Sequence, residues 1–303
     1  MIWILLILTT AIGGAFLIAR TQRIQIADAR KGATGGFYQL RDGVTHANWH
    51  GPIDGPIAVC IHGLSTSSYV WGPLLPHLTA QGYRVLTYDL FGRGLSDRPH
   101  GPQTREFFLR QLRDLLAANK IEVPVTLIGY SMGGCIASAR AVEAPDQVSR
   151  LILLAPAGLG LTSDRFTKFI QTWPILGDWV GEVLGPRVYR ILWARAPSDA
   201  PEVQAIFKQL RGELGREGYL QAIISSLRNM LIEDMDEDHI LIAKSGLPVL
   251  AIWGGSDPII PLKAIGRLSE MNRNAIQVQL AGAGHGLPYT HTEAVADAIE
   301  KNL

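Results

Sequence analysis

Three residues, far apart along the chain, have the types and settings needed for nucleophilic acyl chemistry. The first is Ser131, in Gly129-Tyr130-Ser131-Met132-Gly133, between an apolar run typical of a buried strand and a helical pattern. Glycines at 129 and 133 permit a turn so tight that side chains there would collide with neighbouring backbone. The N-terminal end of the new helix and the N–H of Met132 would then favour negative charge beside the hydroxyl. We interpret Ser131 as a nucleophile, the alternative being a passive serine in a glycine-rich turn.

A serine nucleophile needs a base, and the base needs an acid that orients it. His285 lies in a glycine-containing loop directly after the last expected strand, and Asp257 follows the expected strand before it. Because the carboxyl ends of parallel strands meet at one edge of a sheet, we expect all three side chains to converge there. The remaining histidines have no partner that the sequence identifies, and we expect structural or surface roles for His46, His50 and His77.

The elements that would position these residues alternate between strand and helix. Strands are expected at 57–61, 83–88, 125–129, 148–155, 247–253 and 275–280, and short β-like pieces at 37–40 and 45–50. This alternation predicts an α/β fold whose mostly parallel central sheet is flanked by helices. Residues 159–246 have helical patterns and no convincing strand, which predicts a helical cap inserted between two core parts, 37–158 and 247–303. The last helix is expected to begin at a capping box, Thr290-x-x-Glu293.

Composition excludes several classes of protein. With 47% hydrophobic and 18% charged residues, the 303-residue chain can form a substantial core. A formal charge of +1 provides no basic excess for a run of phosphates, so we expect no nucleic-acid partner. Only two cysteines are present, Cys60 and Cys135, both in apolar runs, which excludes a disulfide scaffold and a cysteine zinc site. We expect no metal and no cofactor, and the oligomeric state is not predicted.

The N-terminus predicts a membrane anchor. Residues 1–19 carry no charged side chain, and as a helix they would extend about 28 Å, close to the roughly 30 Å of a hydrocarbon layer. Trp3 suits an interfacial position. The alternative is a cleaved signal peptide and an exported protein, with Ala27-Asp28-Ala29 as the cleavage site. Residues 20–36 are expected to be a linker, and its basic residues place the catalytic part in the cytoplasm by the positive-inside rule.

The order of the motifs resembles that of a known family. After the first buried strand comes Ile61-His-Gly-Leu-Ser65, and after the second Asp89-Leu-Phe-Gly-Arg-Gly-Leu-Ser-Asp97. The Gly-Tyr-Ser-Met-Gly-Gly134 turn, the Gly-Gly-Ser-Asp-Pro loop and Gly-His285 follow in turn. From about residue 37 to the C-terminus the chain resembles the α/β-hydrolase superfamily, and within it the capped serine esterase and monoacylglycerol-lipase-like branch.

The resemblance implies roles for further residues. The backbone N–H groups of Leu64 and Met132 would form an oxyanion hole, and His62 would shape its loop rather than transfer protons. The segment from Asp89 to Asp97 would be structural. Tyr130, beside the serine, and Trp173 and Trp193 of the cap are the expected substrate contacts. Aromatic side chains of the cap could line an apolar acyl pocket.

The expected activity is hydrolysis of carboxylic esters through an acyl-enzyme, with apolar acyl esters, including monoacylglycerols, as substrates. A serine at this turn disfavours the dehalogenases and epoxide hydrolases of the superfamily, which use aspartate there. Carbon–carbon bond hydrolysis and cofactor-free perhydrolysis remain alternatives on the same triad. A binding protein that merely has this fold is a further alternative, although all three triad positions are occupied.

Overall fold

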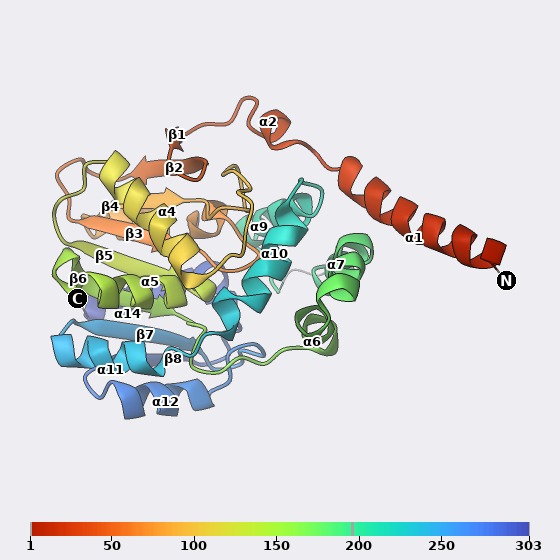
Figure 1. Cartoon of the computed structure of the whole chain (residues 1–303). Helices are drawn as coiled ribbons and strands as arrows, with labels where there is room; N and C mark the ends of the chain where they lie inside the picture. The colour runs from red at the N-terminus through yellow and green to blue at the C-terminus, as the bar shows by residue number, and fades with distance from the viewer. Residues whose placement is uncertain (1, 195–196, 303) are drawn as a thin grey trace.

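An eight-stranded sheet organises the part of the chain that the structure describes (Figure 1). The computed structural model describes residues 2–194 and 197–302, with backbone only for residues 2 and 4–9. The strand order is β1-β2-β4-β3-β5-β6-β7-β8. Only the pairs β1–β2 and β2–β4 are antiparallel. The strands are β1 (Gly36–Gln39), β2 (Val44–His50), β3 (Ile57–Ile61), β4 (Arg84–Tyr88), β5 (Val125–Tyr130), β6 (Val148–Leu154), β7 (Val249–Gly254) and β8 (Ile276–Leu280).

Helices cover both faces of this sheet, which confirms the α/β fold expected from the alternating pattern. One layer consists of α4 (Arg105–Ala118), α5 (Met132–Glu143), α11 (Asp236–Ser245) and α12 (Lys263–Met271). Within it, α4 contacts α5, α5 contacts α11, and α11 contacts α12. On the other face, α14 (Thr292–Lys301) contacts α3 (Leu75–Ala80) and β7. Every residue of β5 and of β7 is buried, as continuous apolar runs predict for strands covered on both faces.

The helices within residues 159–235, which lie between β6 and β7 in the chain, form a separate layer over one end of the sheet (Figure 1). We call residues 159–235 the helical insertion. It contains α6 (Arg165–Thr172), α7 (Pro174–Val183), α8 (Gly185–Leu192), α9 (Pro201–Glu213), α10 (Tyr219–Arg228) and the short η3 (Met230–Ile232). A small apolar cluster that includes Leu214, Tyr219 and Ile223 holds part of it together. By contrast α11, which the expected cap boundary included, packs against α5 and α12 beside the sheet.

At the N-terminus, α1 (Ile2–Thr21) projects from the body of the molecule (Figure 1). It contacts α7, where the Trp179 indole N–H donates a hydrogen bond to the Ile12 carbonyl oxygen at 2.9 Å. The anchor predicted for residues 1–19 falls partly outside the described residues, because nothing is described of residue 1 or of the side chains at 2 and 4–9. Within what is described, no helix combines the length and apolar character needed to cross a membrane.

The segment expected to be a linker makes ordered contacts with the body of the protein. Ile24 pairs with the chain beside Arg216, and its backbone exchanges hydrogen bonds with Gly215 and Glu217. Arg23 forms an ion pair with Glu182 of α7, and both side chains are nearly inaccessible to solvent. The short α2 (Ile26–Ala29) follows. These contacts bind the N-terminal segment to the helical insertion.

Candidate active site

The turn from β5 into α5 places Ser131 in a conformation that few side-chain-bearing residues adopt. Its φ is +53° and its ψ is −118°. A β-carbon on Gly129 would lie 2.5 Å from the Gly133 carbonyl oxygen, and one on Gly133 would lie 2.0 Å from the Ile61 carbonyl oxygen. The tight turn predicted from these two glycines is therefore confirmed. It holds the Ser131 hydroxyl at the carboxyl end of the sheet.

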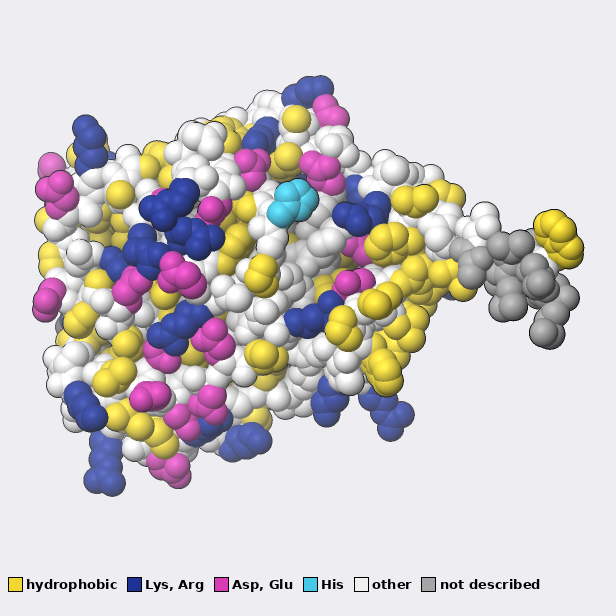
Figure 2. Space-filling model, in the orientation of Figure 1, with side chains coloured by type: hydrophobic (Ala, Val, Ile, Leu, Met, Phe, Trp, Pro, Cys, Tyr) yellow, Lys and Arg dark blue, Asp and Glu magenta, His cyan; other side chains and the backbone are white. Residues whose placement is uncertain are grey.

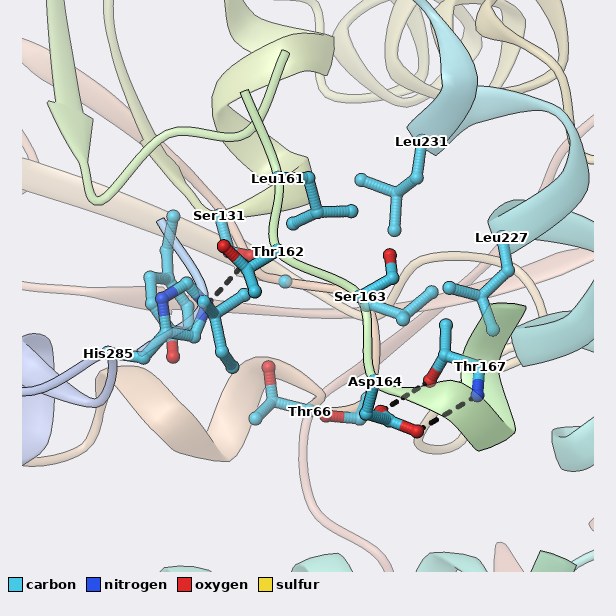
Figure 3. Close-up of a pocket in the computed structure, with 15 residues that line it drawn as sticks. Thr66, Ser131, Leu161, Thr162, Ser163, Asp164, Thr167, Leu227, Leu231 and His285 are labelled. Atoms are coloured by element: carbon cyan, nitrogen blue, oxygen red, sulfur yellow. Dashed lines mark hydrogen bonds between the residues drawn. The ribbon is translucent and has the colours of Figure 1, made fainter. Parts of the chain in front are cut away.

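The structure brings Ser131, His285 and Asp257 into one hydrogen-bonded chain. The His285 Nε2 atom lies 3.0 Å from the Ser131 Oγ atom (Figure 3). Its Nδ1 atom lies 2.7 Å from an Asp257 carboxylate oxygen. Asp257 follows β7, and His285 follows β8, so neighbouring strand ends deliver both. With Nδ1–H donating to the carboxylate, Nε2 is left with its lone pair toward the serine hydroxyl. That is the tautomer a general base requires.

Backbone donors fix the orienting carboxylate. The second Asp257 oxygen accepts hydrogen bonds from the N–H groups of Ile259 at 2.8 Å and Ile260 at 3.0 Å. Only 1% of the Asp257 side chain is exposed, which keeps water from competing with the imidazole for it. The Tyr130 ring lies against the histidine, with the ring centroids 5.3 Å apart. The Asp257 carboxylate, the Ser131 hydroxyl and the Tyr130 ring therefore determine how the imidazole is oriented.

Two amide groups beside Ser131 are suited to bind an oxyanion. Met132 is the first residue of α5, so its N–H has no partner within the helix. Leu64 lies in the loop after β3 and lines the same pocket as Ser131. Among the described residues, no protein group accepts a hydrogen bond from either N–H. Together with the dipole of α5, these amides could stabilise negative charge at a substrate oxygen.

A buried arginine that the sequence analysis did not single out fixes the Leu64 loop. The Arg93 guanidinium is fully buried, and its Nε atom donates to the Leu64 carbonyl oxygen at 2.9 Å. The same group bonds to Phe91 within its own loop and reaches α10, where it donates to the Ser226 hydroxyl at 2.8 Å and the Ala222 carbonyl oxygen at 3.3 Å. Arg93 thus joins one predicted oxyanion donor to the helical insertion.

Asp89 and His62 build the surrounding loops and lie outside the hydrogen-bonded chain at Ser131. Burial alone would raise the pKa of Asp89, but its hydrogen bond to His46 and the charge of that ring hold it well below the usual range. The carboxylate also accepts from the N–H groups of Ser68 and Leu95. Burial lowers the pKa of His62 to about 4, and this neutral ring accepts a hydrogen bond from the Leu90 N–H at 2.9 Å.

The pocket in front of Ser131 encloses about 180 Å³ and has two chemically different walls. Leu161, Leu227 and Leu231 line one side, and polar residues line the other (Figure 3). That polar wall consists of Ser65, Thr66, Thr162, Ser163, Asp164 and Thr167. The Thr66 hydroxyl is buried and has no hydrogen-bond partner among the residues that the structure describes. Within the described residues, no group of three histidine, cysteine or carboxylate side chains is arranged to hold a metal ion.

Of the three expected aromatic contacts, only Tyr130 lines this pocket. Trp193 stacks on Tyr189 within the helical insertion, with centroids 4.9 Å apart. Trp173 lies at the junction of α6 and α7, is 57% exposed, and borders a groove next to α1. Spacing along a helical segment does not reveal which aromatic side chain faces the sheet, and the leucines of the insertion take the place that the tryptophans were expected to fill.

Comparisons with known proteins agree with the fold. A pimeloyl-(acyl-carrier protein) methyl ester esterase of Chromobacterium violaceum is 28% identical over 258 residues, which cover 82% of this chain and 94% of that esterase. An uncharacterized protein of Mycobacterium tuberculosis is 30% identical over 235 residues, covering 69% of this chain but only 64% of the mycobacterial protein. The enol-lactonase of Burkholderia xenovorans LB400 has a TM-score of 0.73 at 21% identity, covering 88% of this chain and 98% of the lactonase.

Carboxylic ester hydrolases are therefore among the relatives of this protein. Residues 58–298 match the alpha/beta hydrolase family, a match that includes Ser131, Asp257 and His285. This range covers well over half of the chain. It begins within β3 and includes the strands β4 to β8. The chain belongs to the alpha/beta hydrolase family.

Proposed function

We propose that the protein is a serine hydrolase that cleaves carboxylic esters, with Ser131 as nucleophile, His285 as general base and acid, and Asp257 as the orienting carboxylate. One observation carries this proposal: the continuous hydrogen-bonded chain from Asp257 through His285 to Ser131, next to two amides without acceptors. Relatives that hydrolyse carboxylic methyl esters support it. A binding protein would have no need for this tautomer or for the turn that exposes the serine hydroxyl.

In the proposed reaction, the Ser131 oxygen attacks the ester carbonyl carbon while its proton passes to Nε2 of His285. The N–H groups of Leu64 and Met132 bind the carbonyl oxygen as it becomes negative. The imidazolium, stabilised by Asp257, then gives its proton to the leaving alcohol. In the second half, His285 takes a proton from water, the hydroxide attacks the acyl carbon, and the proton returns to Ser131. Loss of one oxyanion donor typically slows such reactions by roughly 100- to 1,000-fold.

The two walls of the pocket support a proposal for the substrate class. Three leucines and Ile259 suit an apolar acyl chain, and the polar wall with the unpartnered Thr66 hydroxyl suits an alcohol that has further hydroxyl groups. A monoacylglycerol has both parts. The enclosed 180 Å³ is below the roughly 300–1,000 Å³ of ligand pockets that hold drug-sized molecules. We therefore expect short to moderate acyl chains, with Tyr130 as an additional substrate contact.

We also propose that the helical insertion acts as a cap over this pocket and that residues 1–19 anchor the chain in a membrane with the catalytic part in the cytoplasm. Three leucines of the insertion form the apolar wall, so the insertion would shape the acyl site. The uncharged sequence before Arg20 and the basic residues after it support the anchor and its orientation.

The test uses the full chain in detergent or vesicles, with a fluorophosphonate probe and a chain-length series of p-nitrophenyl and monoacylglycerol esters. We expect the probe to label Ser131, and the series to have an optimum at short to moderate chains. The Ser131→Ala variant should be folded, unlabelled and inactive. Folded wild type that the probe does not label would refute the nucleophile. Labelling without turnover of any ester would refute ester hydrolysis and favour carbon–carbon cleavage or perhydrolysis.

A further inference from the structure

The helical insertion exposes large apolar side chains at its surface. Ile175 is 89% exposed, Ile191 is 68% exposed and Leu192 is 58% exposed. Leu176, Leu184 and Trp173 are exposed as well, and we call these six residues the apolar patch. Figure 2 shows hydrophobic side chains gathered where the insertion adjoins α1. Monomeric soluble proteins rarely expose large apolar patches. Such a patch usually marks a surface that contacts another protein, a ligand or a membrane.

We propose that the apolar patch lies in the interfacial layer of a lipid bilayer, alongside α1. This proposal rests on the anchor proposed above and adds a second, independent surface of contact. A groove between the two elements is lined by Ile12 of α1 and by Trp173, Ile175 and Trp179 of the insertion. The part of the patch that α7 and its first turn provide therefore adjoins the helix that would enter the membrane.

The contact between α1 and α7 determines how deep the patch would lie. Trp179 donates its hydrogen bond to the carbonyl oxygen of Ile12, which is seven residues before Ala19. Seven residues of helix extend about 10 Å. If residues up to 19 enter the hydrocarbon layer, α7 must follow to about that depth or lose this contact. Helices that lie in the bilayer interface bury their apolar faces by a similar roughly 5–10 Å.

The charges on the same helices fit anionic lipid headgroups. Arg165, Lys168, Arg187 and Arg190 are exposed, and none forms an ion pair with another described residue. The acids of α7 are already neutralised, because Asp178 pairs with Arg228 and Glu182 pairs with Arg23. Tryptophan side chains, here Trp173 and Trp179, are enriched at the boundary between headgroups and acyl chains. Apolar, aromatic and basic side chains together favour a membrane surface over a soluble protein partner.

The proposed orientation places the active-site pocket near the lipid. Asp164, which caps α6, lines the pocket, and Trp173 of the patch follows the last residue of the same helix. The eight residues of α6 extend about 12 Å. An ester leaving the bilayer would thus travel about the length of α6, roughly 12 Å, to reach the pocket.

Cysteine labelling tests this surface without depending on turnover. The native Cys60 and Cys135 are buried, and burial raises the pKa of both thiols, so an introduced cysteine would be labelled selectively. Ile175→Cys and Leu192→Cys report on the patch. Ile53→Cys and Val123→Cys are matched controls, because both side chains are exposed but belong to the part of the chain that forms the sheet and its flanking helices, outside the helical insertion. Each full-length variant carries a polarity-sensitive fluorophore in vesicles of phosphatidylcholine and phosphatidylglycerol.

At 175 and 192 we expect blue-shifted emission, quenching by brominated lipid, and a several-fold loss of quenching by aqueous iodide. At 53 and 123 the iodide should quench freely. Equal iodide access at all four positions would overturn the proposal. Efficient disulfide crosslinking between chains at position 175 would assign the patch to a second copy and would also overturn it. Unchanged melting temperatures establish that the variants fold.

Failure of this proposal is distinguishable from failure of the proposed function. Protein that does not co-float with vesicles would refute the anchor and the apolar patch together. Fluorophosphonate labelling of Ser131 in the same samples reports on the nucleophile alone, whatever the fluorophores show.

Discussion

Replacing Asp257 by asparagine should nearly abolish turnover by reversing the tautomer of His285. One carboxylate oxygen accepts two backbone N–H groups, from Ile259 and Ile260, and the other accepts Nδ1–H of His285. An asparagine has only one oxygen, and two fixed donors at 2.8 and 3.0 Å will hold it on the backbone side. Its NH₂ group then faces His285, so Nδ1 must accept and the ring proton must move to Nε2. A protonated Nε2 cannot take the proton of Ser131.

The expected loss in kcat is about 10⁴-fold, which corresponds to about 5.4 kcal/mol. KM should change little, because Asp257 does not line the pocket. The assay is steady-state hydrolysis of a short p-nitrophenyl ester at pH 7, with thermal unfolding to establish that the fold is retained. The exposed Asp54 provides a matched control, since Asp54→Asn removes a carboxylate and should leave kcat unchanged. A loss below about tenfold in a fully folded Asp257→Asn variant would refute the tautomer argument.

Three further predictions concern stability, each measured by thermal or denaturant unfolding of the full chain. Gly133→Ala should destabilise the protein by at least the roughly 1–3 kcal/mol of an overpacked core, because its β-carbon would meet the Ile61 carbonyl oxygen. The control Gly212→Ala has open space around its β-carbon and should be tolerated. Equal stability of the two variants would contradict this prediction. Asp89→Asn should cost about 3–5 kcal/mol at pH 7 by breaking a buried ion pair. Because the folded pKa of Asp89 is lowered, that difference should shrink as the pH falls below about 4, and a constant difference would contradict the assignment. Burial raises the pKa of Glu182 from 4.5 to about 7, so wild type should lose up to about 3 kcal/mol of stability as the pH rises from 4.5 through 7. Glu182→Gln should lack this loss, and parallel pH profiles for the two proteins would count against it.

The strand and loop pattern was enough to predict the sheet and the residues that meet at its edge. Ser131, Asp257 and His285 each follow a short apolar run, and parallel strands bring their carboxyl ends together regardless of what lies between them. The close approach of backbone at Gly129 and Gly133 could likewise be inferred, because only glycine fits such a turn. Local sequence and global topology agree at these positions, so little tertiary information was needed.

Other features depend on contacts that no local pattern encodes. Arg93 resembles any loop arginine in sequence, and only the fold reveals that its guanidinium is buried and joins three segments. Trp173 and Trp193 directly follow the last residues of α6 and α8, and the contacts of their rings, with the groove beside α1 and with Tyr189, depend on how these helices pack. The expected capping box at Thr290 was wrong. That hydroxyl donates to the Gly286 carbonyl oxygen within the short α13 (Leu287–Thr290), and α14 begins at Thr292.

The hydrogen bonds of Arg93 constrain how a substrate can reach the serine. The guanidinium holds the carbonyl of Leu64 and, at the same time, the hydroxyl of Ser226 in α10. A hinge motion that lifted the whole insertion would break either the bonds of this guanidinium to α10 or its bond to the Leu64 loop, and would so remove charge-assisted hydrogen bonds of a buried cation. Opening should instead be confined to α6 through α8, whose described residues form no hydrogen bond with this arginine. Substrate and product would then pass on the α6 side, while Leu64, whose N–H is the proposed oxyanion donor, keeps its carbonyl bonded to Arg93.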